Sequence, residues 1–157
     1  MAAKISAEIK GLKETQRNME QAVKDLRGTP MLNAMRDATL YVTRDAKINA
    51  PVDTGRMRAS ITPEVTAQGD TVQGVVGSNV AYAPYVELGT RPHWPPRAAL
   101  EVWARRHHMN VFLVQRSIGQ FGTAGRHYLQ RAFDANKDKI ERRIGQAVDG
   151  IIKKANE

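Results

Sequence analysis

The 157-residue sequence contains no cysteine, which excludes disulfide bonds and thiolate metal sites. It also lacks any apolar run that approaches the roughly 18 residues of a membrane-spanning helix, so no membrane partner is predicted. The opening residues Met-Ala-Ala-Lys-Ile-Ser have no apolar stretch typical of a signal peptide. Together these absences predict a cytoplasmic product.

Positive charge is what the chain has in excess, and its distribution is uneven. The formal net charge is +8. Residues 1–90 contain 11 Lys and Arg against 10 Asp and Glu, whereas residues 91–157 contain 13 against 6 and all four histidines. This basic half predicts contact with an anionic partner, either nucleic acid or an acidic protein surface. A solvated helical face is the alternative, because no run of basic residues exceeds two.

Two helices are predicted at the start of the chain. The first has apolar residues at heptad spacing with one polar position, Gln16, and Gly28-Thr29-Pro30 ends it. We expect this helix to dock on its own domain or on a neighbouring subunit. The second runs from Pro30 to Asn49 and stops before Pro51. The apolar residues of the first seam are Ile5, Ile9, Leu12, Met19, Val23 and Leu26.

The composition of the central residues predicts strands, and helices are predicted after them. β-Branched residues at 61–66 and 71–76, with a Gly-Asp turn between them, predict a hairpin. Residues 82–88 are expected as a short edge strand because of Pro84. Helices are predicted at about 95–108, 111–121 and from 130 onward, with a short strand at 128–129.

This layout predicts an α+β fold, with a small antiparallel sheet packed with helices and with long N-terminal and C-terminal helices. We expect residues 1–28 to form a helical arm and residues 29–157 to form a single domain.

The stretch NAPVDTGRMRASI at residues 49–61 is the first candidate for chemistry. Asp53 could act as a general acid or base, and Glu87 is the other carboxylate in a motif-like setting. The structural reading is stronger, because Asp53-Thr54-Gly55 is turn chemistry in which Asp accepts a downstream N–H and Gly takes a positive φ. No aromatic cluster typical of a sugar site accompanies the carboxylates, and Ser60 and Ser78 have no neighbouring base. No catalytic residue or cofactor is predicted.

The histidines do not form a recognisable metal motif. His107 and His108 are adjacent, so on a helix they point about 100° apart and cannot chelate one ion as an i, i+4 pair would. His93 or His127 could join one of them only through the fold. The alternative is a polar tip at a basic helix end. No metal site is predicted.

Nucleic-acid binding remains open as a function of the basic half. It would depend on phosphate contacts and on salt, because no helix-turn-helix, aromatic ribonucleoprotein motif or zinc knuckle is present. The arginines that would carry it are Arg105, Arg106, Arg116, Arg126, Arg131, Arg142 and Arg143.

Three segments in this order resemble the tail-component family of long-tailed bacteriophages. They are PVDTGRMRASI at 51–61, YAPYVELGT at 82–90 and GRHYLQRA at 125–132. The resemblance covers roughly residues 30–155. The third segment departs from the family pattern, with His127-Tyr128 for Pro-Phe and Arg131 for Pro.

The resemblance implies a small α+β structural protein of the phage neck, not an enzyme, which joins head to tail or completes the tail. It implies a ring of copies, six by usual tail symmetry, that contacts other neck and tail proteins close to packaged DNA. Such a protein is made in the bacterial cytoplasm and ends up in the virion. A tail terminator and a small basic DNA-binding protein are the alternatives. The resemblance and the turn chemistry single out an interaction or structural motif: Asp53, Thr54, Gly55, Arg56, Arg58, Tyr82, Tyr85, Glu87, Gly89 and Thr90. Glu87 is a candidate partner for Arg56 or Arg58.

Overall fold

The computed structural model describes residues 12–69 and 71–156, which divide into two compact units. Unit 1 contains the described residues of Met1–Val42, Pro63–Val76 and Ala135–Glu157. Unit 2 contains Thr43–Thr62 and Gly77–Asp134. Within the described residues, no helix has both the length and the apolar character needed to span a bilayer.

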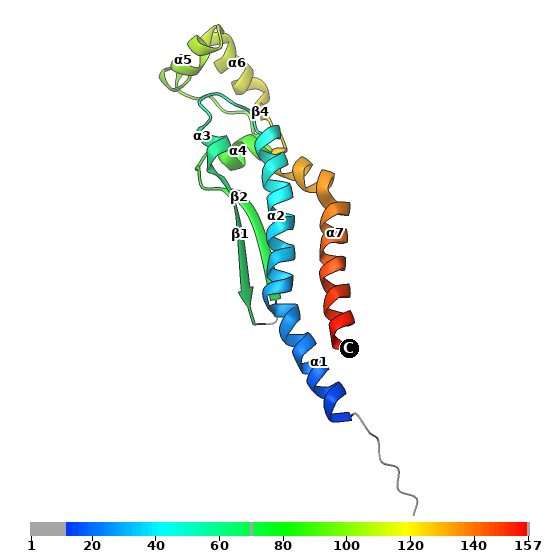
Figure 1. Cartoon of the computed structure of the whole chain (residues 1–157). Coiled ribbons are helices and arrows are strands. Elements are labelled where there is room, and N and C mark those ends of the chain that lie inside the picture. The colour runs from blue at the N-terminus through cyan, green and yellow to red at the C-terminus, as the bar shows by residue number, and fades with distance from the viewer. Residues whose placement is uncertain (1–11, 70, 157) are drawn as a thin grey trace, which may run out of the picture. The chain divides into compact units, whose positions relative to one another are not determined.

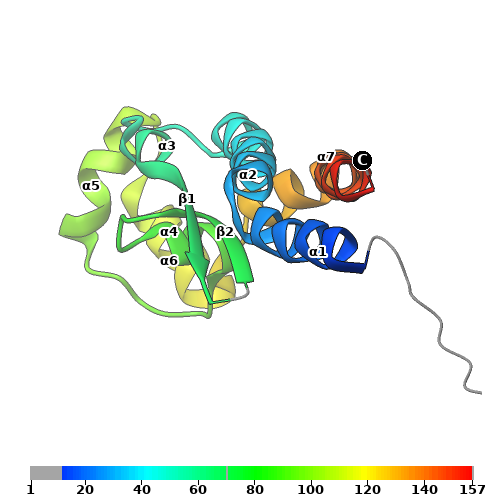
Figure 2. The same ribbon diagram turned by 60° about the horizontal axis from the view of Figure 1, so that its bottom comes forward.

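Unit 1 combines helices with a β-hairpin. Its elements are α1 (Leu12–Arg27), most of β1 (Ile61–Gln68) and β2 (Thr71–Ser78), and large parts of α2 (Thr29–Asn49) and α7 (Tyr128–Ala155). The two strands form a two-stranded sheet. Figures 1 and 2 show α2 between this hairpin and α7.

Small residues on α2 build the core of unit 1. Ala34, Ala38 and Val42 are buried at a spacing of four residues, so they lie along one face of the helix. Met31 and Ala34 pack with Ala147 of α7. Three partly buried residues surround this cluster: Val72, Ile144 and Val148. The alanines let α7 approach closely, but they bury little apolar area, so this core is modest.

A glycine lets the hairpin lie close to α2. A Cβ on Gly74 would come within 2.6 Å of Thr39 Cγ2 and 2.8 Å of Met35 Sδ. A Cβ on Gly77, three residues further along β2, would meet no atom within 4 Å. The contact of β2 with α2 therefore requires glycine, which has no side chain, at position 74.

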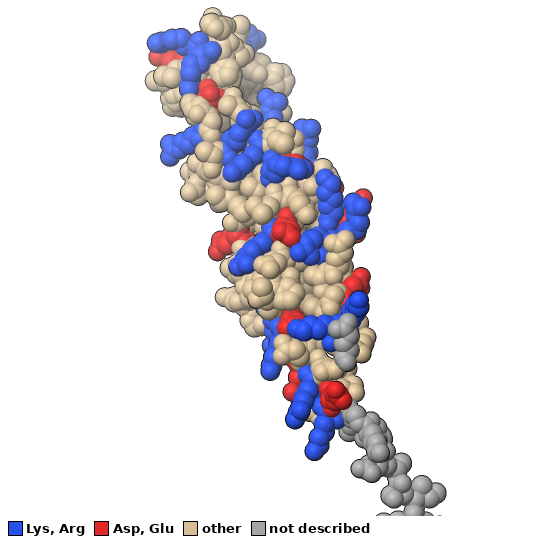
Figure 3. Space-filling view, viewed as in Figure 1, with Lys and Arg blue, Asp and Glu red and all other residues tan. Residues whose placement is uncertain are grey.

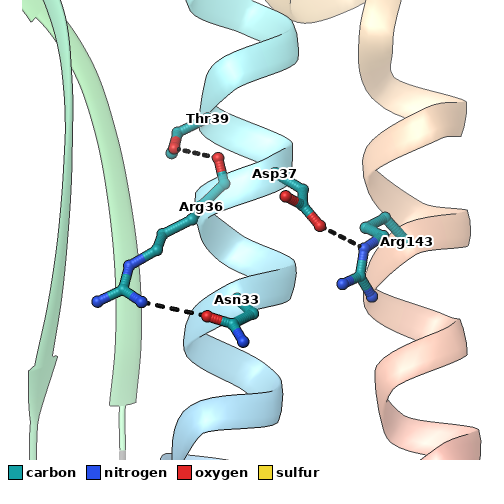
Figure 4. Close-up of polar contacts among 5 residues, drawn as sticks. All are labelled: Asn33, Arg36, Asp37, Thr39 and Arg143. Atoms are coloured by element: carbon teal, nitrogen blue, oxygen red, sulfur yellow. Dashed lines mark hydrogen bonds and ion pairs between the residues drawn. The ribbon is translucent and has the colours of Figure 1, made fainter.

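Polar contacts tie α7 to the first two helices of unit 1. Arg143 Nε donates to Asp37 Oδ2 on α2 at 2.8 Å, as Figure 4 shows. Lys154 Nζ donates to Asp25 Oδ2 on α1 at 3.1 Å. Hydrogen bonds from Gln21 and Lys154 hold the pKa of Asp25 below its ordinary value. Surface pairs of this kind contribute little to stability.

Unit 2 contains the shorter elements. They are α3 (Arg56–Ser60), α4 (Ala83–Leu88), β3 (Gly89–Thr90), α5 (Arg97–Arg106), α6 (Val111–Phe121) and β4 (Thr123–Ala124), together with the first residues of α7. β3 pairs with β4 in antiparallel register, Gly89 opposite Ala124 and Thr90 opposite Thr123. Asn110 accepts a hydrogen bond from Phe112 N at 2.9 Å and so caps the start of α6.

The predicted α+β class is confirmed, with long helices at both ends of the described chain and a small antiparallel sheet. The expected hairpin is present, as are helices at 30–49, 95–108 and 111–121 within one or two residues. The first helix is confirmed from Leu12 onward, while the seam residues Ile5 and Ile9 lie outside the described residues. The division into a 1–28 arm and a 29–157 domain stays a prediction.

Two predicted strands are wrong. Residues 83–88 form the helix α4, because Pro84 occupies its first turn, where a missing N–H costs nothing. Tyr128 begins α7, so the helix starts two residues before the predicted Gln130 and leaves no strand at 128–129. Proline is compatible with both an edge strand and a first helical turn, and the six-residue segment is too short for periodicity to decide.

Candidate interaction site

The second and third motif segments interlock in unit 2. Arg126 N donates to Val86 O at 2.8 Å, and His127 N donates to Glu87 O at 3.0 Å. A Cβ on Gly125 would lie 2.6 Å from Glu87 O, so the two backbones meet more closely than side chains would permit. The second and third motif segments, which are distant in the sequence, are therefore joined by backbone hydrogen bonds.

Glu87 caps the start of α7. Its Oε2 accepts from Leu129 N and its Oε1 from Gln130 N, each at 3.0 Å. The first N–H groups of a helix have no partner within the helix, and a carboxylate there is favoured by the helix dipole. The predicted pairing of Glu87 with an arginine is wrong, because both its oxygens bind backbone N–H groups. Arg58 instead donates to Ala50 O at 3.4 Å.

Gly89 makes the turn after α4 possible. Its φ is +81°, and a Cβ there would lie 2.3 Å from Thr123 O across the small sheet. Thr90 Oγ1 and Thr123 Oγ1 are 3.0 Å apart. Because an L side chain is both strained at this φ and too close to β4, glycine is the residue that fits.

Tyr128 is the first residue of α7 and follows directly on the contact of His127 with Glu87. Its relative exposure is 0%, and its hydroxyl has no hydrogen-bond partner among the described residues. Burial raises the pKa of the Tyr128 phenol above its ordinary value, and the negative charge of Glu87 adds to the shift. Tyr128 is thus a packing residue with an unsatisfied polar atom.

The first motif segment is held to α5. Asp53 Oδ2 lies 2.7 Å from Arg106 Nη2, and Asp53 Oδ1 lies 3.4 Å from His107 Nε2. The His107 ring stacks on Trp103 at 4.5 Å between centroids. Gly55 has the expected positive φ, at +82°, but α3 has no side-chain cap. Asp53 therefore forms an ion pair with a residue that is distant in the sequence, and no local sequence pattern predicts this contact.

The remaining motif residues are mostly at the surface. Thr54, Arg56 and Arg58 are exposed, and α3 places Met57 in the core between the two arginines. Both arginines lie on the short helix α3, which leads directly into β1 at Ile61. Ser60 Oγ bonds Ser78 Oγ at 2.6 Å, so these two hydroxyls contact one another.

Two grooves open beside this framework. The first has a volume of about 1090 Å³, and the second about 750 Å³. Tyr85, Gly89 and Thr90 line the first, whereas Asp53 and Tyr82 line the second. Leu100, Trp103, Ile118 and Thr123 line both. Leu100 and Trp103 lie on α5, the helix that the sequence predicts at about 95–108, and no local sequence pattern connects them with the motif.

The two motif carboxylates both make structural contacts. Asp53 is engaged by Arg106 and His107, and Glu87 is engaged by α7. Across residues 12–69 and 71–156, no group of three or more His, Cys, Asp or Glu side chains is placed to hold a metal ion.

One comparison identifies a family. Residues 12–89 match the family model HK97-gp10_like, described as "Bacteriophage HK97-gp10, putative tail-component". This region, which runs from α1 to Gly89 of β3, is similar to that family of phage tail components, and it contains the first motif segment and the second as far as Gly89. No match was found among curated proteins or among solved structures.

Proposed function

We propose that the chain is a structural protein of the phage neck, which joins head to tail or completes the tail. The match of residues 12–89 to a tail-component family carries this proposal. The framework supports it, because the motif carboxylates hold helices in place. The chain is not an enzyme in this proposal, and it needs no cofactor.

The protein works as a ring of copies, with six favoured by the symmetry of tails. Heterologous contacts between identical subunits close into rings when the rotation permits. Unit 2 offers apolar surface for such contacts: Trp94 is 64% exposed, Leu113 60% and Phe121 78%. Leu113 and Phe121 lie on α6 and Trp94 precedes α5, and large exposed apolar side chains of this kind are typical of interaction surfaces.

The protein ends up in the virion and is made in the host cytoplasm. Its motif residues are those singled out in the sequence, from Asp53 to Thr90, and they position unit 2 for contact with adjacent neck and tail proteins. Residues 1–28 serve as an arm. Its described part exposes Met19, Val23 and Leu26 of the heptad seam.

Electron microscopy of particles from the parent phage with this gene disrupted tests the role. DNA-filled heads beside separate tails of normal length support a joining or completing role. Tails of uncontrolled length point to a terminator instead. Intact infectious particles would remove the neck assignment. Complementation with the intact gene is the control.

A further inference from the structure

The first groove has a one-sided charge. Its basic lining residues are Arg91, His93 and Arg126, and no Asp or Glu is among the described residues that line it. All three are exposed. The second groove differs, because Asp53 and Arg106 line it together as an ion pair. Only the first groove therefore presents uncompensated positive charge.

The rest of this groove is apolar and partly aromatic. Tyr85, which is 61% exposed, and Trp103 provide ring surfaces. Aliphatic and proline residues complete the lining: Pro51, Val86, Pro92, Pro95, Leu100 and Ile118. Basic side chains beside an apolar lining match a ligand that carries carboxylates on either side of an apolar side chain.

The small sheet lies at the same place. Gly89 and Thr90 of β3 and Thr123 and Ala124 of β4 all line the groove. In the described chain this sheet consists of these two strands alone, so each strand has an edge without a neighbouring strand. Extended peptides bind proteins by adding a strand to such an edge, while pockets beside it select alternate side chains. The groove thus favours an extended segment over a helix.

We propose that this groove, which we call the β3–β4 groove, binds an extended acidic and apolar peptide segment of a neighbouring protein in the particle. Arg91 and Arg126 attract the carboxylates of the segment, and Tyr85 packs on its apolar side chain. The proposal rests on the proposed neck role only for the source of the segment. The binding itself is a property of the purified chain.

Three labelled nine-residue peptides test the proposal by fluorescence anisotropy with the full-length protein. The first alternates Glu or Asp with Leu, Val and Phe. The second replaces its acids by Lys, and the third replaces its apolar residues by Ser. We expect the first to bind with a Kd of about 10–100 µM at low salt, and the other two to bind at least about tenfold more weakly.

Variants locate the binding. Arg91→Glu with Arg126→Glu is expected to weaken the first peptide by about tenfold or more, and Tyr85→Ser by about threefold to tenfold. The control, Arg105→Glu with Arg131→Glu, makes the same change of charge at exposed residues that line neither groove, and it is expected to stay within about twofold.

Three results would overturn the proposal. They are no binding of the first peptide at protein concentrations up to about 1 mM, equal binding of the Ser-substituted peptide, or equal weakening by the control variant. Loss of peptide binding leaves the particle experiment unaffected, and intact particles after gene disruption leave the peptide result unaffected, so the two proposals fail separately.

Discussion

At the scale of single residues, the Tyr128 hydroxyl makes a clear stability prediction. It is buried with no partner among the described atoms, and such a group costs about 1–3 kcal/mol relative to a satisfied one. Tyr128→Phe keeps the ring and removes the hydroxyl. We expect the free energy of unfolding to rise by about 1 kcal/mol, measured by urea denaturation. Tyr82→Phe, at an exposed ring, is the control and should change it by less than about 0.5 kcal/mol.

The same phenol gives a dependence on alkaline pH. The pKa of Tyr128 in the folded protein lies above its ordinary value of 10.0, so the folded state retains the proton when the unfolded state loses it. The free energy of unfolding is therefore unaffected by this ionisation below pH 10.0, and it falls as the pH rises from there through the raised pKa. The difference in stability between wild type and Tyr128→Phe should widen above that pH. A constant difference from pH 8 to 11 would show that Tyr128 ionises equally in both states.

Glu87 makes a second residue-scale prediction. Glu87→Ala leaves Leu129 N and Gln130 N without their acceptor, and we expect the free energy of unfolding to fall by about 1–2 kcal/mol. Glu87→Gln keeps one carbonyl acceptor and should lose about half as much. Urea denaturation measures both, with Glu101→Ala on the exposed face of α5 as the control. Equal stability of all three variants would argue against the cap.

At the scale of elements, the docking of the hairpin on α2 can be tested with a matched pair of glycines. Gly74→Ala places a Cβ 2.6 Å from Thr39 Cγ2, whereas Gly77→Ala places one in open space on the same strand. We expect Gly74→Ala to destabilise unit 1 by about 1–3 kcal/mol and Gly77→Ala to be neutral or slightly stabilising. Thermal unfolding followed by circular dichroism compares them. Equal midpoints would mean that β2 does not rest on Thr39 and Met35.

The elements also show what local sequence signals can predict. Gly28 and Pro51 bracket α2, and Asn110 caps α6, so these helices follow from chemistry within a few residues. The site depends on contacts between distant positions. Asp53 meets Arg106, and Glu87 meets the start of α7, without any local pattern that could announce either contact. Gly89 and Gly125 stand in the motif segments, but no local pattern predicts their role, which is close backbone approach.

At the scale of the whole molecule, the basic half has a structural explanation in part. Arg106 is paired with Asp53 and Arg143 with Asp37. Figure 3 shows acidic side chains interspersed among the Lys and Arg of the visible face. Duplex DNA is bound strongly by surfaces that present many unpaired cations along one track, and interspersed carboxylates weaken such a track.

This distribution predicts weak, salt-sensitive binding to DNA. We expect a Kd for a duplex of random sequence above about 1 µM at about 150 mM salt, with a logarithmic salt slope that corresponds to few phosphate contacts. Anisotropy of a labelled duplex over a salt series measures both values. Arg105→Glu with Arg131→Glu should reduce the affinity modestly at low salt. A nanomolar Kd at 150 mM salt would instead favour a DNA-binding protein over a neck component. The reason is that a protein that joins rings needs complementary protein surfaces and gains nothing from tight binding to the DNA that passes it.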